Sequence, residues 1–170
     1  MTSRTEDTSG ATAGADGGSP GTLRALRSAV SRLESLRAIE ELTRRYAAGI
    51  DDRNWELFSS VWTSTPALVL DPTRQPLDLA AIEQWLTQIW GRTILTRHYV
   101  VNNWIELSAQ SPSQAIGLCR QDVVLLAANG TSRLAAATAY DNYERGEDGN
   151  WRIARRRLHS AHHVALGTVR

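Results

Sequence analysis

The sequence predicts one α+β domain in which N-terminal helices pack on one face of a mostly antiparallel sheet. Apolar residues recur at helical spacing from Leu23 to Ile50 and again from Leu79 to Ile89. Four strand-like runs follow Gly91, and their connections are too short to hold crossover helices, so the strands are expected to pair as an antiparallel meander. A chain of 170 residues suits a single core.

The first 20 residues are rich in Gly, Ser, Thr, Ala and Asp and, after Met1, contain no large apolar residue. Such a segment buries too little surface to offset the entropy of ordering. We therefore expect a disordered tail at 1–20 and a single domain at 21–170. The tail lacks the apolar central region of a secretory signal, and no run approaches the length of a membrane span, so a cytoplasmic protein is expected.

Two helices joined as a hairpin are expected next. A polar turn follows the first helix, and Asp52 or Asn54 can cap a second amphipathic segment that carries Trp55, Phe58 and Trp62. The apolar stripe of the first helix consists of Leu26, Val30, Leu33, Leu36, Ile39, Leu42, Tyr46 and Ile50.

The remaining elements are a short strand, a third helix and the meander. "ALVLD" at 67–71 reads as a strand that ends at Pro72, and Asp78 can cap the third helix. The four runs that follow are separated by "SAQSPS", "ANGTS" and "GEDGN", which are typical of turns. The alanine-rich "RLAAATAY" is expected to be a strand because no helix stop signals flank it. The four runs are "TRHYVVNNWIEL", "QAIGLCRQDVVLLA", "RLAAATAYDNYER" and "WRIARRRLHSAHHVAL".

Composition excludes several classes of function. The net charge is +1, and all 19 basic residues are Arg, so no long basic face is left unbalanced for nucleic acid and no Lys exists for Schiff-base chemistry. The sequence contains no phosphate-binding loop, Rossmann fingerprint or nucleophile elbow, which favours chemistry without a cofactor. His159, His162 and His163 lack a nearby Cys or carboxylate cluster, so no metal site is expected.

Three segments, in this order, resemble the SnoaL-like group of the nuclear transport factor 2-like superfamily over residues 30–160. The resemblance implies a conical barrel, in which a strongly bent sheet wraps the long helix and encloses a deep apolar pocket, often in a homo-oligomer. Members include dehydratases, isomerases, cyclases and epoxide hydrolases, and some are non-catalytic ligand-binding or structural subunits. The segments are "AIEELTRRYAAGIDDRNWELFSSVW", "RHYVVNNWIEL" and "AYDNYERGEDGNWRIARRRL".

The pattern is most similar to the scytalone dehydratase and bile acid dehydratase-like members, in which a Tyr and an Asp from the first helix and its following turn meet a His from the sheet. The resemblance carries these roles over to Tyr46, Asp51 and His98. An imidazole that titrates near neutrality can act as general base, a carboxylate on its other nitrogen orients it, and a phenol can donate to the oxygen where negative charge develops. Each residue also has a purely structural interpretation. Tyr46 could be a core tyrosine, Asp51 a helix cap, and His98 a strand histidine bonded to backbone.

Further residues are expected to contact the substrate. Asn102 shares the parity of His98 on its strand, and Gln121 or Asp122 offers the further polar group that the resemblance implies on the next strand. Arg157 can reach the cavity to hold an anionic group. The tryptophans, Trp62 and Trp85 among them, are expected to line the core or the pocket and suit a flat apolar ligand. Both parities of 96–105 are apolar, which predicts that a partner chain covers the outer sheet face.

The sequence thus predicts a cofactor-independent dehydratase, isomerase or cyclase that acts on an apolar polycyclic or polyketide-like small molecule. His98 is the expected base, Asp51 orients it, and Tyr46 donates a hydrogen bond. One alternative is an epoxide hydrolase, in which a carboxylate activates water within a set of Asp, Asn and Arg side chains. Another is a non-catalytic binding or structural subunit. A homo-oligomer, dimer or trimer, is expected, with no nucleic-acid or membrane partner.

Overall fold

The computed structural model describes residues 19–168, apart from the side chains of residues 161 and 162. The chain forms α1 (Pro20–Asp51), α2 (Trp55–Ser59), β1 (Trp62–Val69), α3 (Leu79–Arg92), β2 (Thr93–Leu107), β3 (Gln114–Ala127), β4 (Thr131–Arg145) and β5 (Trp151–Thr168). The sheet order is β1-β5-β4-β3-β2. Strands β2 to β5 pair antiparallel in sequence order, and β1 runs parallel to β5. The predicted α+β class and antiparallel meander are confirmed.

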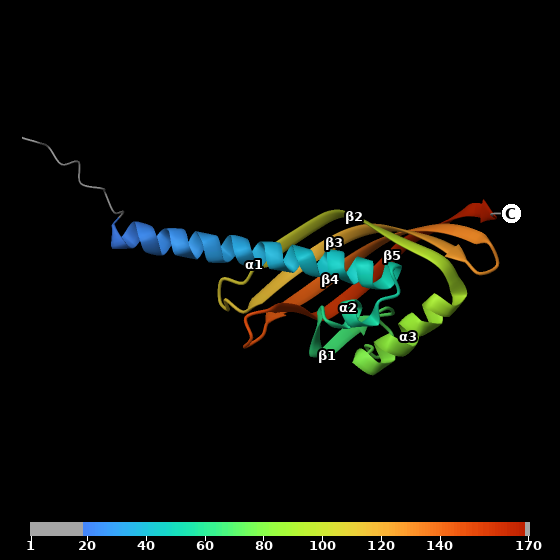
Figure 1. Ribbon diagram of the computed structural model, residues 1–170, viewed down its shortest axis with the longest axis horizontal. Helices are drawn as coiled ribbons and strands as arrows, with labels where there is room; N and C mark the ends of the chain where they lie inside the picture. Colours follow the sequence, from blue (N-terminus) through green and yellow to red (C-terminus); the bar gives the residue numbers. More distant parts are fainter. Residues whose placement is uncertain (1–18, 169–170) are drawn as a thin grey trace, which may run out of the picture.

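Helix α1 lies along one face of the bent sheet, while α3 lies near the opposite end of the domain from the N-terminal part of α1 (Figure 1). Strands β1 and β2 form the two edges, so the five-stranded sheet wraps around the helices without closing. Residues 1–18 of the predicted tail lie outside the described residues. Its last two residues begin the helix instead: the Ser19 hydroxyl accepts from the Thr22 amide, and Pro20 takes the first helical position. The domain boundary stays a prediction.

The N-terminal half of α1 extends beyond the sheet (Figure 1). Leu23, Leu26, Val30 and Leu33 are exposed, and burial begins at Ser35. The predicted buried stripe is therefore right only for the second half of the helix. Helical spacing shows that a face is apolar, but it does not show whether another element lies beneath it.

Helix α2 is shorter than the sequence predicts. Asn54 is its N-cap, with the side-chain oxygen accepting from the Leu57 amide at 2.9 Å. Trp62 begins β1 instead of continuing the helix, and the strand starts five residues before the predicted 67–71 segment. Pro66 lies inside this strand, which is possible because β1 is an edge and its pairing with β5 shifts between Trp62 and Ala67.

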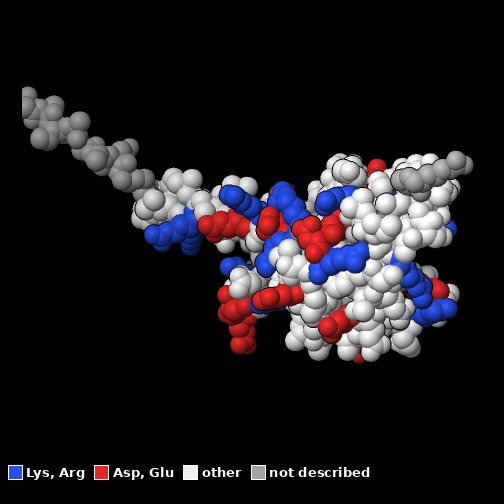
Figure 2. Space-filling view, turned by 45° about the vertical axis from the view of Figure 1, so that its right-hand side comes forward, with Lys and Arg blue, Asp and Glu red and all other residues white. Residues whose placement is uncertain are grey.

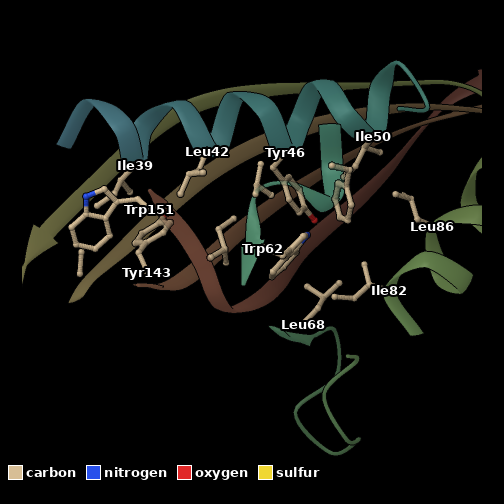
Figure 3. Close-up of a cluster of buried hydrophobic side chains, with 14 residues drawn as sticks. Ile39, Leu42, Tyr46, Ile50, Trp62, Leu68, Ile82, Leu86, Tyr143 and Trp151 are labelled. Atoms are coloured by element: carbon tan, nitrogen blue, oxygen red, sulfur yellow. The ribbon is translucent and has the colours of Figure 1, made fainter. Parts of the chain in front are cut away.

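The core lies between α1 and the concave face of the sheet. Figure 3 shows Ile39, Leu42, Tyr46 and Ile50 projecting from α1 toward Trp62, Tyr143 and Trp151. Gly49 allows α1 and α2 to approach closely, because a Cβ at this position would lie 2.7 Å from the Phe58 Cβ. The remaining fully enclosed members of the cluster include Phe58, Val61, Leu68, Ile82, Leu86 and Ile153.

The strand pairing is irregular at several points, and two of these decide which candidate residues face the interior. In β2, Val100 pairs with Gln121 and Asn102 with Arg120, so Val101 is an extra residue. In β5, Ile153 pairs with Tyr143 and Arg155 with Asn142, so the alternation shifts at Ala154. Because successive side chains point to opposite faces, one extra residue moves every later side chain to the other face.

The surface shown in Figure 2 carries Arg and acidic side chains side by side, with no continuous field of one sign. This agrees with the net charge of +1. Among residues 19–168, no helix combines the length and apolar character that crossing a membrane requires.

Candidate active site

The last residue of α1 and a residue of β2 form a close acid–base pair. The Asp51 Oδ1 lies 2.6 Å from the His98 Nδ1, and the Asp51 Oδ2 accepts from the His98 backbone N–H at 2.8 Å. Each side chain is only 8% exposed. One carboxylate therefore holds both the ring and the backbone of the same histidine, which fixes the orientation of the imidazole.

Asp51 is an unusual residue for its position. A negative charge at a helix C-terminus is unfavourable because unsatisfied carbonyl groups make that end negative. The alternative role as cap of α2 is taken by Asn54. The hydrogen bonds from His98 supply the compensation that the helix end does not.

The pKa of Asp51 shows the same balance. Burial acts to raise it, but the hydrogen bonds from the His98 ring and backbone outweigh burial, and the pKa lies below its ordinary value. An ionised carboxylate only accepts hydrogen bonds, so the His98 Nδ1 must donate. In the neutral imidazole, Nε2 then carries the free lone pair and can take a proton.

An apolar cavity of about 240 Å³ lies beside this pair, between the sheet and α3. His98 and Tyr46 form part of its wall. Strand β4 contributes Ala135 and Ala137, whose small side chains leave space where larger residues would fill the interior. The remaining wall is formed by Ile50, Leu70, Trp85, Leu86, Ile89, Thr96, Gln121, Val123, Leu125, Leu158, Ser160 and His163.

A second hollow of about 620 Å³ lies between α1 and the edge strand β2. Asp51 and His98 also belong to its lining, together with Glu40, Arg44 and Arg97. His98 thus stands between an apolar cavity on one side and a charged groove on the other. The imidazole therefore borders both an apolar space and a polar one.

Tyr46 is 1% exposed and lies in the interior beside the cavity. Its ring packs against Phe58 with centroids 5.0 Å apart, and the Arg156 guanidinium lies 4.1 Å from its centroid. Burial raises the pKa of Tyr46 above its ordinary value, although the charge of Arg156 acts in the opposite direction. The phenol therefore stays protonated near neutral pH and is able to donate.

Sequence reasoning missed a buried ion pair behind Tyr46. Arg156 donates from Nε and Nη2 to the two Asp141 oxygens, both at 2.7 Å, and the Tyr143 hydroxyl donates to Asp141 at 2.8 Å. Both charged side chains are fully buried. Simple alternation from Ile153 places Arg157 inward and Arg156 outward, and the irregularity at Ala154 reverses this. The sequence signal for this ion pair is the position of Asp141, which lies two residues before Tyr143 and therefore on the same buried face of β4.

The predicted substrate-contacting residues on β2 and β3 divide between the two sheet faces. Gln121 is 3% exposed and lies in the cavity wall. Asp122 alternates with it and projects to the outer face. Asn102 does not share the face of His98, because the extra residue Val101 reverses the strand between them.

The three remaining predicted contact residues lie in different parts of the structure: Arg157, Trp62 and Trp85. Arg157 is exposed on the outer face, where its guanidinium lies 4.8 Å from the Tyr140 ring centroid, so it is not placed to hold a ligand in the cavity. Trp62 is 3% exposed and belongs to the core cluster. Trp85 lies in the cavity wall from α3.

Comparisons with known proteins point to one family. The model of the SnoaL-like domain matches residues 31–157. No curated protein sequence matches the chain.

Solved structures share the fold at low sequence identity. The hexachlorocyclohexane dehydrochlorinase LinA type 3 from Novosphingobium barchaimii is 21% identical, with 82% of this chain and 95% of that chain covered and a TM-score of 0.73. A protein from Novosphingobium aromaticivorans assigned as a scytalone dehydratase is 18% identical, with 84% and 93% covered and a TM-score of 0.73. At this identity the structures establish the fold alone.

Proposed function

Because this chain belongs to the SnoaL-like family, we propose that it is a cofactor-independent acid/base enzyme that catalyses an elimination on an apolar cyclic small molecule. The observation that carries the proposal is the 2.6 Å contact between Asp51 and His98 in the wall of an apolar cavity. The two similar structures are named for a dehydrochlorinase and a dehydratase, and both names describe eliminations. A dehydratase is the leading form, and isomerase or cyclase chemistry begins with the same proton transfer.

The proposed reaction begins at the His98 Nε2. This atom takes a proton from a substrate carbon, and the electron pair of the broken C–H bond forms a double bond to the neighbouring carbon. The bond from that neighbouring carbon to the leaving group breaks, and the leaving group takes the electron pair of this bond. Asp51 stabilises the imidazolium that forms. If the leaving group is hydroxide, the imidazolium returns the proton and water is released.

Tyr46 assists by donating a hydrogen bond to the departing or carbonyl oxygen. Its raised pKa suits this role because the phenol keeps its proton. An apolar surround strengthens the interaction, since little water competes for the developing charge.

The epoxide hydrolase alternative is favoured less by these contacts. That chemistry needs a carboxylate free to activate water. Both Asp141 oxygens accept from Arg156, one also accepts from Tyr143, and the carboxylate is fully buried. The non-catalytic alternative predicts no turnover in the wild type, and changes to the Asp51–His98 pair would then alter only stability or assembly.

Replacing His98 tests the proposal directly. Wild type and His98→Ala are incubated with hexachlorocyclohexane and with scytalone, and chloride release and dehydration are followed. Removing a general base lowers the rate by about 10² to 10⁴. Near-UV circular dichroism establishes whether the variant remains folded.

His159→Ala is the matched control, because His159 is an exposed histidine of β5 outside the cavity wall. It is expected to retain wild-type turnover. A folded His98→Ala protein with full turnover contradicts the assignment of the base.

A further inference from the structure

Gln121 is a buried polar residue whose hydrogen bonding is incomplete. Its residue is 3% exposed, and its Oε1 has no partner among the residues that the structure describes. Leaving a buried amide oxygen without a partner costs free energy. The fold does not require an amide here, since neighbouring inward positions of the same strand hold Cys119 and Val123. Because Gln121 also lies in the cavity wall, a ligand in the cavity is placed to complete its hydrogen bonds.

The space beside this amide comes from strand β4. Gln121 pairs directly with Ala137, and Val123 pairs with Ala135, so two alanines face the cavity next to it. Thr96, Ser160 and His163 are further polar residues of the wall, and the Ser160 Oγ lies 3.0 Å from the His163 Nε2. Within residues 19–168, the Gln121 Oε1 has no such partner.

The volume of the cavity indicates the size of ligand that it can hold. A dry apolar cavity of about 150 Å³ holds benzene, and sites for drug-sized molecules begin near 300 Å³. The cavity of about 240 Å³ falls between these values. This volume matches one ring or two fused rings.

We propose that the cavity takes a compact substrate of one or two fused rings and that the Gln121 amide binds a hydroxyl group on that ring. A hydroxyl both donates and accepts, so it matches an amide whichever way the amide is turned. The proposal rests on the proposed function, in that the same cavity is the reaction site.

The positions of Gln121 and His98 make this contact useful for orientation. His98 pairs with Val123 on β3, two residues from Gln121, so the two side chains are diagonal neighbours on one face. Such neighbours lie about 7–8 Å apart, which is close to the width of one or two rings. A hydroxyl held at Gln121 therefore sets which ring carbon faces the imidazole.

Binding of 2-naphthol and naphthalene, followed by fluorescence titration, tests the proposal without requiring turnover. Wild type is expected to bind 2-naphthol about tenfold more tightly than naphthalene, in line with one hydrogen bond in an apolar site. Gln121→Leu is nearly the same size and should lose this preference while keeping its affinity for naphthalene. Ala137→Leu fills the space and should weaken binding of both probes.

Three results overturn the proposal: no preference for 2-naphthol in the wild type, a preference that survives in Gln121→Leu, or binding of both probes that Ala137→Leu leaves unchanged. His98→Ala separates this inference from the proposed function. If the preference persists in His98→Ala and is lost in Gln121→Leu, the hydroxyl is bound by Gln121, whatever the turnover assays show. If it disappears in His98→Ala and persists in Gln121→Leu, the imidazole binds the hydroxyl and the assignment to Gln121 is wrong.

Discussion

Two carboxylates of this domain are paired with nitrogen bases in the interior, and the two pairs have different surroundings. Asp141 and Arg156 are fully enclosed and are joined by two hydrogen bonds, while the Arg156 Nη1 has no partner among the described residues. Asp51 and His98 are 8% exposed and stand between a cavity and a groove. Guanidinium keeps its proton at all working pH values, whereas an imidazole can both accept and donate one. Burial and pairing therefore do not identify a catalytic group; access and an exchangeable proton do.

The enclosed pair also contacts Tyr46, which lines the same cavity as His98. Burial acts to lower the pKa of Arg156, but the charge of Asp141 and its hydrogen bonds, together with the nearby Tyr46 and Tyr143, hold this pKa well above its ordinary value. The charged guanidinium lies on the ring of Tyr46, and Figure 3 shows Tyr46 and Tyr143 in one cluster beneath α1. Under the proposed function, this contact holds the phenol in position.

The largest expected effect comes from breaking the enclosed pair. Arg156→Ala leaves the Asp141 charge buried without its partner, which costs about 3–5 kcal/mol of unfolding free energy. Urea denaturation followed by circular dichroism measures the change. Arg155→Ala, at the neighbouring exposed position, should leave stability nearly unchanged.

A double replacement sharpens this prediction. Asp141→Leu combined with Arg156→Met removes both charges and keeps apolar volume, so most of the stability lost in Arg156→Ala should return. If Arg156→Ala unfolds at the wild-type urea concentration, the enclosed pair has no structural role and the contrast between the pairs fails.

Asp51→Asn tests the Asp51–His98 pair. It should lower the turnover rate more than it lowers the stability of the fold. An amide can still accept from the His98 backbone, but its NH₂ group favours the imidazole tautomer with the lone pair at Nδ1. Turnover should fall by about 10² to 10⁴. Steady-state kinetics and urea denaturation of the same preparation separate the two effects.

Asp52→Asn is the control for this change, because Asp52 is the adjacent carboxylate and its side chain is 64% exposed. It should retain wild-type kinetics. Equal loss of turnover in both variants would indicate a general effect of charge at the end of α1, and the special role of Asp51 would be wrong.

Features that depend on local residue spacing, such as helix ends and caps, were predictable from the sequence. The Asp51–His98 contact was predictable through the family resemblance. The end of α1, the N-cap Asn54 and the cap of α3 at Asp78 each depend on a few neighbouring residues. These signals place Asp51 at the end of a helix and His98 on a strand. They do not measure the distance between them.

Residues beyond an irregular strand position were not predictable. Asn102 and Arg157 were assigned to the cavity by regular alternation, and the shifts at Val101 and Ala154 place both outside it. The same shift brings Arg156 inside. The pairing of one strand with its neighbour decides these faces, and a single sequence does not contain that register.

The smallest expected effect is a pH dependence of the unfolding free energy that comes from the Asp51–His98 pair. The pKa of Asp51 lies below its ordinary value of 3.8 in the folded protein. A carboxyl group with a lowered folded pKa stabilises the fold above its unfolded pKa, and this contribution is lost as pH falls through the folded pKa. The unfolding free energy of wild type should therefore fall more steeply below about pH 4 than that of Asp51→Asn. Urea denaturation from pH about 5 to 2 measures both slopes; parallel curves would mean that His98 does not stabilise the Asp51 carboxylate in the fold.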